Sequence, residues 1–269
     1  MPSQPVDRVI WVHIGTHKTG TTSIQNALAA NRERLRSHGL YVPTAGTTHA
    51  HSGHHNLAWQ LRDDPRFQPG RGTLDDLLAE LSTVTEPGAV ISSEDFEYCV
   101  EYPQRLAGFE RALRAAGWEP RYLVLFRRQS GYAGSLYAEL LRHGLTASFP
   151  RFVAEILGRA RFELHGDWCF HFDYMAFTAR WARAASGTLH VRAFTRQQPG
   201  SCLIEQFLGA IGAPAEAVPS IAADARMLNV GTIEPTTPSR RLAGLLIDAR
   251  FALTNARLRR RFGVDLRCG

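Results

Sequence analysis

Short apolar runs alternate with longer amphipathic stretches along most of this chain. Four runs are apolar at almost every position and are predicted to be buried β-strands, at residues 9–14, 88–92, 121–126 and 189–194. Elsewhere apolar residues recur every three or four positions, which is typical of amphipathic helices. These helices are predicted at residues 23–37, 73–83, 103–116, 131–143, 149–158, 174–185, 201–211 and 238–262, with one more headed by His54 or His55. The alternation predicts an α/β fold, a central parallel sheet flanked by helices, in a single domain spanning residues 1–269.

The first strand leads into a turn with the composition of an anion-binding loop. The segment VIWVHIGTHKTGTTSIQ combines the strand, two glycines and a run of hydroxyl residues where a helix begins. Glycines permit close approach of the backbone, and the first N–H groups of a helix point outward at the positive end of its dipole. Lys18 in this turn is the only lysine in the chain. The turn is therefore predicted to bind a phosphate or sulfate through Lys18, Thr19, Gly20, Thr21, Thr22 and Ser23.

This turn differs from the standard phosphate loop of nucleotide hydrolases. That loop has lysine directly after its second glycine, whereas here Thr21 follows Gly20 and Lys18 precedes it. The sequence also has no apolar strand that ends in a lone aspartate placed to serve Mg²⁺. We therefore expect no metal at the site. A nucleotide-dependent kinase with a degenerate loop is the alternative enzyme, and a magnesium requirement would distinguish it.

Composition and charge narrow the class of protein. With 269 residues and 44% hydrophobic content, the chain can bury a substantial core. The net charge of +6 suits anionic ligands, but it is spread along the chain and does not indicate nucleic acid. The four scattered cysteines lack metal-site spacing and are expected to be reduced thiols in a cytoplasmic protein. We also expect no signal peptide and no membrane span.

A second candidate anion site follows the third apolar run. In YLVLFRRQSGYAGSLY, Arg127 leaves the carboxyl end of the predicted strand, and Ser135 lies in the helix that follows. Ligands of open parallel sheets bind beyond the carboxyl ends of strands. A guanidinium fork and a hydroxyl at this edge are suited to a phosphate, so Arg127 and Ser135 are predicted to bind one. Arg128 is expected to point away.

Together, the two motifs resemble those of sulfotransferases that use 3′-phosphoadenosine 5′-phosphosulfate (PAPS). HKTGTTSIQ resembles their 5′-phosphosulfate loop, and the spacing of Arg127 and Ser135 is similar to their 3′-phosphate motif. The resemblance implies a P-loop NTPase-like sulfotransferase fold. It also implies metal-independent, in-line transfer of a sulfuryl group from PAPS to a hydroxyl of a glycan or small-molecule acceptor. Lys18 would then stabilise charge on the leaving phosphate.

Two regions offer a base for the acceptor hydroxyl. His49, His51, His54 and His55 are close in sequence, but no Cys, Asp or Glu joins them, which favours a substrate-side loop over a metal site. The second apolar run ends in SSED, which places Glu94 at the carboxyl edge of the sheet. His54 and Glu94 are the predicted catalytic bases, with His55 as an alternative. The alternative roles are a surface loop for the histidines and the start of a helix for Glu94.

Three further features leave alternatives open. The aromatic-rich segment at residues 161–174 could line an acceptor pocket, but packing is favoured. Residues 228–231 lie where the resembled family places a loop over the nucleotide, yet they lack its Arg-Lys-Gly form. The basic end of the final helix is expected to be solvated, with docking of a polyanion as the alternative. A non-catalytic nucleotide or polyanion binder is the alternative to an enzyme, and the acceptor and oligomeric state stay open.

Overall fold

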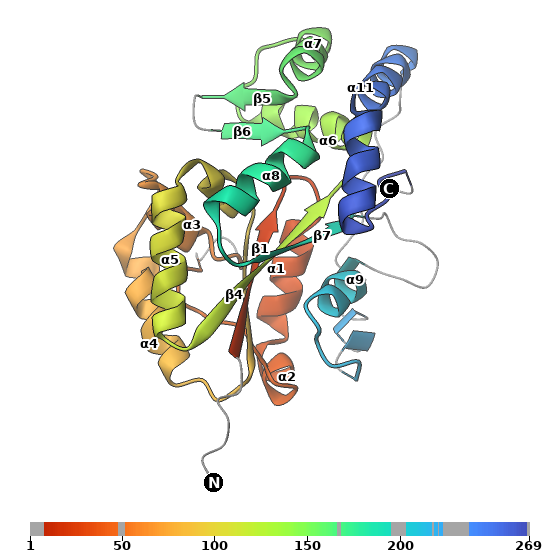
Figure 1. Cartoon of the computed structure of the whole chain (residues 1–269). Coiled ribbons are helices and arrows are strands. Elements are labelled where there is room, and N and C mark those ends of the chain that lie inside the picture. The colour runs from red at the N-terminus through yellow and green to blue at the C-terminus, as the bar shows by residue number, and fades with distance from the viewer. Residues whose placement is uncertain are drawn as a thin grey trace.

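The computed structural model describes residues 8–47, 52–165, 168–194, 203–216, 218–219, 221–222 and 237–267. Its centre is a five-stranded sheet in the order β2–β3–β1–β4–β7 (Figure 1). The strands are β1 (Arg8–Gly15), β2 (Leu40–Tyr41), β3 (Gly88–Ser93), β4 (Trp118–Phe126) and β7 (Thr188–Ala193). All four neighbouring pairs are parallel, so the predicted α/β fold with a central parallel sheet is confirmed.

Helices cover both faces of this sheet because the side chains of its central strand alternate between two cores. Ile10, Val12 and Ile14 of β1 belong to one buried cluster, and Trp11 belongs to the other. The first cluster includes residues from α3 (His55–Arg62), α4 (Leu74–Ser82), α5 (Pro103–Ala115) and α8 (Tyr174–Ala184). The second includes residues from α1 (Thr21–Ala30), α2 (Arg32–Ser37) and α9 (Leu203–Ala210).

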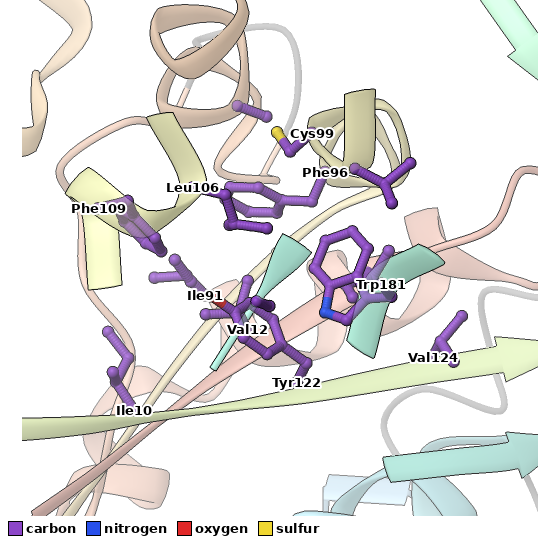
Figure 2. Packing of buried hydrophobic residues seen from close by; sticks show 14 of the residues in the cluster. Ile10, Val12, Ile91, Phe96, Cys99, Leu106, Phe109, Tyr122, Val124 and Trp181 are labelled. Carbon is purple, nitrogen blue, oxygen red and sulfur yellow. The ribbon is translucent and has the colours of Figure 1, made fainter. Parts of the chain in front are cut away.

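Aromatic side chains fill much of the first core. Figure 2 shows Val12, Tyr122 and Val124 of the sheet near Phe96 and Trp181. The rings of Tyr122 and Trp181 meet edge to face, with centroids 5.1 Å apart. This packing fixes the central strands, whose carboxyl ends carry both predicted anion-binding motifs.

A third buried cluster joins the elements beside the sheet. It contains residues of α6 (Gln129–Arg142), α7 (Phe149–Arg159), α11 (Pro238–Phe262) and an antiparallel hairpin of β5 (Arg161–Leu164) and β6 (Trp168–His171). The hairpin occupies the aromatic-rich segment, where the sequence did not predict strands because each is only four residues long. Phe162, Phe170 and Phe172 are buried there, so the predicted packing role of the aromatic residues is confirmed.

Several boundaries differ from the sequence prediction. The helix expected at residues 23–37 begins at Thr21 and is divided at Asn31, whose side-chain amide donates to the Ala27 carbonyl at 2.9 Å. Two 3₁₀ helices, η1 (Pro69–Arg71) and η2 (Glu94–Glu101), complete the described elements. Cys99 and Cys169 are free thiols, and the other two cysteines lie outside the described residues. Within the described chain, no helix combines the length and apolar character needed to span a bilayer.

Candidate functional site

The loop between β1 and α1 is compact because two glycines bring other groups close to its backbone. A Cβ on Gly15 would lie 2.5 Å from Thr21 Oγ1 and 3.2 Å from the Cα of Glu94. Gly20 has a φ of 77° and would place a Cβ 2.3 Å from a methyl group of Leu203. The loop therefore fits against both η2 and α9 only with glycine at these positions.

The hydroxyl residues of the loop divide into two groups. Thr16 Oγ1 donates to the Leu125 carbonyl at 2.7 Å, and Thr19 Oγ1 donates to the Thr16 carbonyl at 2.6 Å. The Thr16 bond holds the loop to β4. The Thr19 bond lies within the loop, so the buried Thr19 hydroxyl stabilises the conformation of the loop. Thr21 Oγ1 is also buried, but it has no hydrogen-bond partner among the described residues. Thr22 is exposed and Ser23 is half-buried at the start of α1.

The backbone at the start of α1 supplies further donors. The first hydrogen bonds within the helix run from the N–H groups of Ser23 and Ile24 to the Gly20 carbonyl, at 3.0 and 3.2 Å. The N–H groups of Thr21 and Thr22 precede these bonds and lie at the positive end of the helix dipole. No acidic residue occupies the first turn. This helix terminus is therefore suited to an anion.

Lys18 adopts a left-handed backbone conformation, with a φ of 62°. Its Nζ lies 3.2 Å from Glu139 Oε2 on α6. Arg142 also contacts Glu139 Oε2, at 3.0 Å. Burial alone would raise the pKa of Glu139, but the nearby Lys18 charge and hydrogen bond help to lower it. The Lys18 ammonium is thus paired with the Glu139 carboxylate, and both side chains are partly exposed.

Arg127 connects the two sequence motifs. Its Nη1 donates to Ser135 Oγ at 2.8 Å and to the Lys18 carbonyl at 3.2 Å. The guanidinium carbon lies 5.6 Å from the centre of the Phe194 ring, and Tyr174 Oη donates to the Arg127 carbonyl at 2.7 Å. The predicted Arg127–Ser135 pair therefore lies beside the Lys18 loop.

Arg128 turns to the opposite side of the strand end, as expected from the sequence. Its Nε and Nη2 bind Asp248 Oδ2 on α11 at 2.9 and 2.7 Å. There it lines a cavity of about 310 Å³ formed by α11 and the following residues, including Asn255, Arg259 and Asp265. The Lys18 loop does not contribute to this cavity, so we place the candidate site by its converging donors rather than by the cavity.

His54 has a buried position with both ring nitrogens bonded to the backbone. The Ser92 N–H donates to Nδ1 at 3.1 Å, which leaves the ring proton on Nε2, 2.9 Å from the Pro43 carbonyl. Burial lowers the pKa of His54 to about 4. This neutral imidazole joins β3 to the chain after β2, and it offers no open nitrogen for the role of base predicted from the sequence.

The adjacent His55 instead joins a cluster of acidic groups at the end of β3. Its Nδ1 lies 3.0 Å from Asp95 Oδ2 and 2.8 Å from Ser93 Oγ, and its Nε2 lies 3.9 Å from Glu94 Oε2. Burial alone would lower the pKa of His55, but its Asp95 hydrogen bond and the two carboxylates raise it. Burial alone would raise the pKa of Asp95, but its hydrogen bond to His55 and the nearby charges of His55 and Arg66 together lower it to about 2.

Glu94 is the predicted base that lies next to the loop. It begins η2, and its Cα is the backbone atom that a Gly15 side chain would approach. Glu94 Oε2 accepts a hydrogen bond from Gln25 Nε2 of α1 at 2.9 Å. The side chain is 21% exposed, compared with 7% for His55, so Glu94 is the more accessible of the two groups.

The contact between His17 and Tyr98 was not predicted from the sequence. His17 Nε2 lies 2.8 Å from Tyr98 Oη, and its ring meets Phe170 of the hairpin edge to face, with centroids 5.1 Å apart. Burial lowers the pKa of His17 despite the nearby charges of Glu94 and Asp95. Only its place next to Lys18 marked His17 in the sequence as a residue near the site. Its partners Tyr98 and Phe170 are distant in the sequence, so the contacts could not be predicted.

Some sequence predictions fall outside the described residues. They concern His49, His51 and the segment at residues 228–231. Within the part that the structure describes, no group of three or more His, Cys, Asp and Glu side chains is arranged to hold a metal ion.

The architecture and the strand–loop–helix site place the chain in the P-loop-like α/β class. Its structure is similar to the crystal structure of a sulfotransferase from Alicyclobacillus acidocaldarius, with a TM-score of 0.58 and 19% identity, over 96% of this chain and 97% of that chain. Similarity to mouse sulfotransferase SULT7A1 complexed with PAP gives a TM-score of 0.45 and 11% identity, over 96% and 88% of the respective chains. No protein-family model and no curated sequence matches.

The similarity to the bacterial enzyme shows that this chain has the sulfotransferase fold, as the sequence motifs implied. The mouse comparison is too distant to add to that assignment. A shared fold at this identity does not assign an activity, because function depends on the site.

Proposed function

We propose that this protein transfers a sulfuryl group from PAPS to a hydroxyl of a glycan or small-molecule acceptor. The observation that carries the proposal is the position of Arg127, whose guanidinium contacts both the Lys18 carbonyl and Ser135. Through these contacts, two motifs far apart in the sequence form one continuous set of cationic and hydroxyl donors. A nucleotide with phosphates at both its 3′ and 5′ positions matches such a set.

The residues of the loop are suited to the 5′ end of this co-substrate. The N–H groups of Thr21 and Thr22 would bind the 5′-phosphate, with the Thr22 and Ser23 hydroxyls beside them. The buried Thr21 hydroxyl, which has no hydrogen-bond partner among the described residues, supports the fit, because such a group is costly unless a ligand bonds to it. Thr19 and Gly20 would shape the loop, through the Thr19 hydrogen bond and the positive φ of Gly20.

Lys18, Arg127 and Ser135 would carry the remaining contacts to the donor. Lys18 would exchange its contact with Glu139 for the bridging oxygen, on which charge develops as the bond from sulfur to the 5′-phosphate breaks. Arg127 and Ser135 would bind the 3′-phosphate. Alignment and charge neutralisation are the main tasks of a protein in such a transfer, as in phosphoryl transfer.

Glu94 is the base that the geometry favours. As the acceptor oxygen bonds to sulfur, its proton would pass to Glu94, and the electron pair of the broken bond would leave with the phosphate. His55 would position Glu94 and balance its charge, since its Nε2 is 3.9 Å from the carboxylate. We do not assign this role to His54, because backbone groups bind both of its ring nitrogens.

The test is release of 3′-phosphoadenosine 5′-phosphate (PAP) from PAPS in EDTA, across a panel of sugars, phenols and alcohols. We expect release that depends on the acceptor. Lys18→Ala should lower the rate at least ~10²-fold, the scale for loss of one preorganised donor. Arg142→Ala is the matched control, because Arg142 also contacts Glu139 but is exposed, and it should change the rate by less than about twofold.

Two outcomes would count against the proposal. Equal rates for Lys18→Ala and the parent protein would remove Lys18 from the mechanism. Phosphoryl transfer from ATP that requires magnesium, without turnover of PAPS, would instead support a kinase.

A further inference from the structure

Exposed leucines are concentrated on one helix of this protein. Apart from Leu141 on α6, the large apolar side chains exposed in the described part of the chain all lie on α11, at Leu242, Leu245, Leu246 and Leu253. Leu245 and Leu253 are 66% and 78% exposed. Because these four residues follow helical spacing, they form one continuous stripe, which we call the leucine face of α11.

The leucine face is distinct from the side of α11 that packs against the core. Ile247, Phe251 and Leu258 are fully buried on the other side of the helix. Figure 1 shows α11 at the edge of the molecule, and its main contacts with the described helices and strands are to α6, α7, α8 and β7. Packing within the described chain therefore explains one apolar side of α11 and leaves the leucine face exposed.

Arginine side chains surround the leucine face. At 3.6 residues per turn, Arg241 and Arg257 lie on its two flanks, and Arg260 continues its line toward the C-terminal end. All three are exposed. The helix has a single carboxylate, Asp248, which is half-buried and paired with Arg128. The exposed side of α11 thus presents apolar residues and positive charge together.

Apolar residues and positive charge on one side of α11 favour an anionic lipid surface over a second copy of this chain as the binding partner. Two copies of the leucine face packed together would bring arginines of both copies close to one another, without carboxylates on that face to pair with them. A surface of anionic lipid has the complementary charge, and its acyl chains would receive the leucines. Arginine stems can lie along the apolar surface while their guanidinium groups bind lipid phosphates.

We propose that the leucine face of α11 binds the surface of an anionic lipid bilayer, with the helix lying in the plane of the interface. The leucines would enter the boundary between headgroups and acyl chains, and Arg241, Arg257 and Arg260 would contact lipid phosphates. This proposal is independent of the sulfuryl-transfer activity, because the described residues of the candidate site lie on other elements.

The test is sedimentation of the full chain with phosphatidylcholine vesicles, with and without about 30% phosphatidylserine. Binding should require phosphatidylserine and weaken at high salt. The double variant Leu245→Gln/Leu253→Gln keeps the charge, and it should lower partitioning at least about tenfold. Arg257→Gln should lower it roughly fivefold, whereas Arg111→Gln, an equal charge change at an exposed site on α5, should have less than a twofold effect.

Three results with vesicles would overturn the proposal. These are no binding to either vesicle, equal binding by the leucine variant and the parent, and equal losses from Arg257→Gln and Arg111→Gln. Sedimentation of the lipid-free protein should give the same mass for parent and leucine variant. A dimer that the leucine variant abolishes would assign the face to self-association instead. Unchanged thermal unfolding and PAP binding would show that the variants are folded.

Discussion

At the scale of single residues, neighbours in the sequence take opposite roles around the site. Arg127 faces the loop while Arg128 faces α11, and His55 joins the acidic cluster while His54 bonds to the backbone. The spacing to Ser135 predicted which arginine faces the loop. No comparable spacing distinguished the two histidines. The partners of His54 are backbone groups of β3 and of Pro43, whereas the acidic partners of His55 lie on η2, and none of these contacts can be read from a local pattern.

Glu97 is a buried residue whose chemistry was not predicted from the sequence. Its side chain lies in η2, and neither oxygen has a hydrogen bond of good geometry within the described residues. Burial raises its pKa to about 8, although the backbone N–H groups of His171 and His17 act in the opposite direction. The carboxyl group is therefore protonated at pH 7 in the folded protein.

Replacement of Glu97 by glutamine should stabilise the protein at neutral and higher pH. Because folding raises the pKa from 4.5 to about 8, the contribution of Glu97 to stability is greatest below pH 4.5 and is lost as pH rises to about 8. Glutamine stays neutral and avoids this loss. We expect Glu97→Gln to add roughly 2–4 kcal/mol to the unfolding free energy at pH 7.5, and less than about 1 kcal/mol at pH 5.

Urea unfolding at the two pH values measures this difference. Glu163→Gln on the exposed part of β5 is the control, and its effect should stay within about 0.5 kcal/mol at both. A gain for Glu97→Gln that is equal at pH 5 and pH 7.5 would show that titration of Glu97 is not the cause.

At the scale of elements, the strand, loop and helix from β1 to α1 were the most predictable part of the site. Their signals are local: an apolar strand, two glycines and hydroxyl residues at a helix start. The hairpin of β5 and β6 was not predicted, because strands of four residues carry little periodicity. The start of η2 at Glu94 agrees with the alternative drawn from the sequence, in which Glu94 begins a helix. Both lie beside the loop: Phe170 of the hairpin meets the His17 ring, and the Cα of Glu94 in η2 lies where a Cβ on Gly15 would come within 3.2 Å of it.

Gly20→Ala tests whether the loop conformation is needed for binding. An alanine would adopt a φ of 77° with strain and would press against Leu203, so the loop and the first turn of α1 should shift. We expect the affinity for PAP to fall about tenfold or more, measured by calorimetry. Gly158→Ala on α7 is the control, because an added Cβ meets nothing within 4 Å there, and it should leave the affinity unchanged. Equal affinities for Gly20→Ala and the parent would show that the loop tolerates the change.

At the scale of the whole molecule, the fold class was predictable and the long-range pairs were not. Alternating strands and helices imply a parallel sheet with helices on both faces, which the structure confirms. The pairs Lys18–Glu139 and Gln25–Glu94 join residues 121 and 69 positions apart. No local pattern specifies such partners, because they depend on how α6 and η2 pack around β1.

The central claim is that the site distinguishes a nucleotide with a 3′-phosphate. It is tested most directly by calorimetric titration of the protein with PAP and with AMP, both in EDTA. We predict micromolar affinity for PAP and binding at least about tenfold weaker for AMP, because only PAP offers a 3′-phosphate to Arg127 and Ser135. Ser135→Ala should reduce this preference and leave AMP binding unchanged. Equal affinity for the two nucleotides, or no binding of either, would contradict the account.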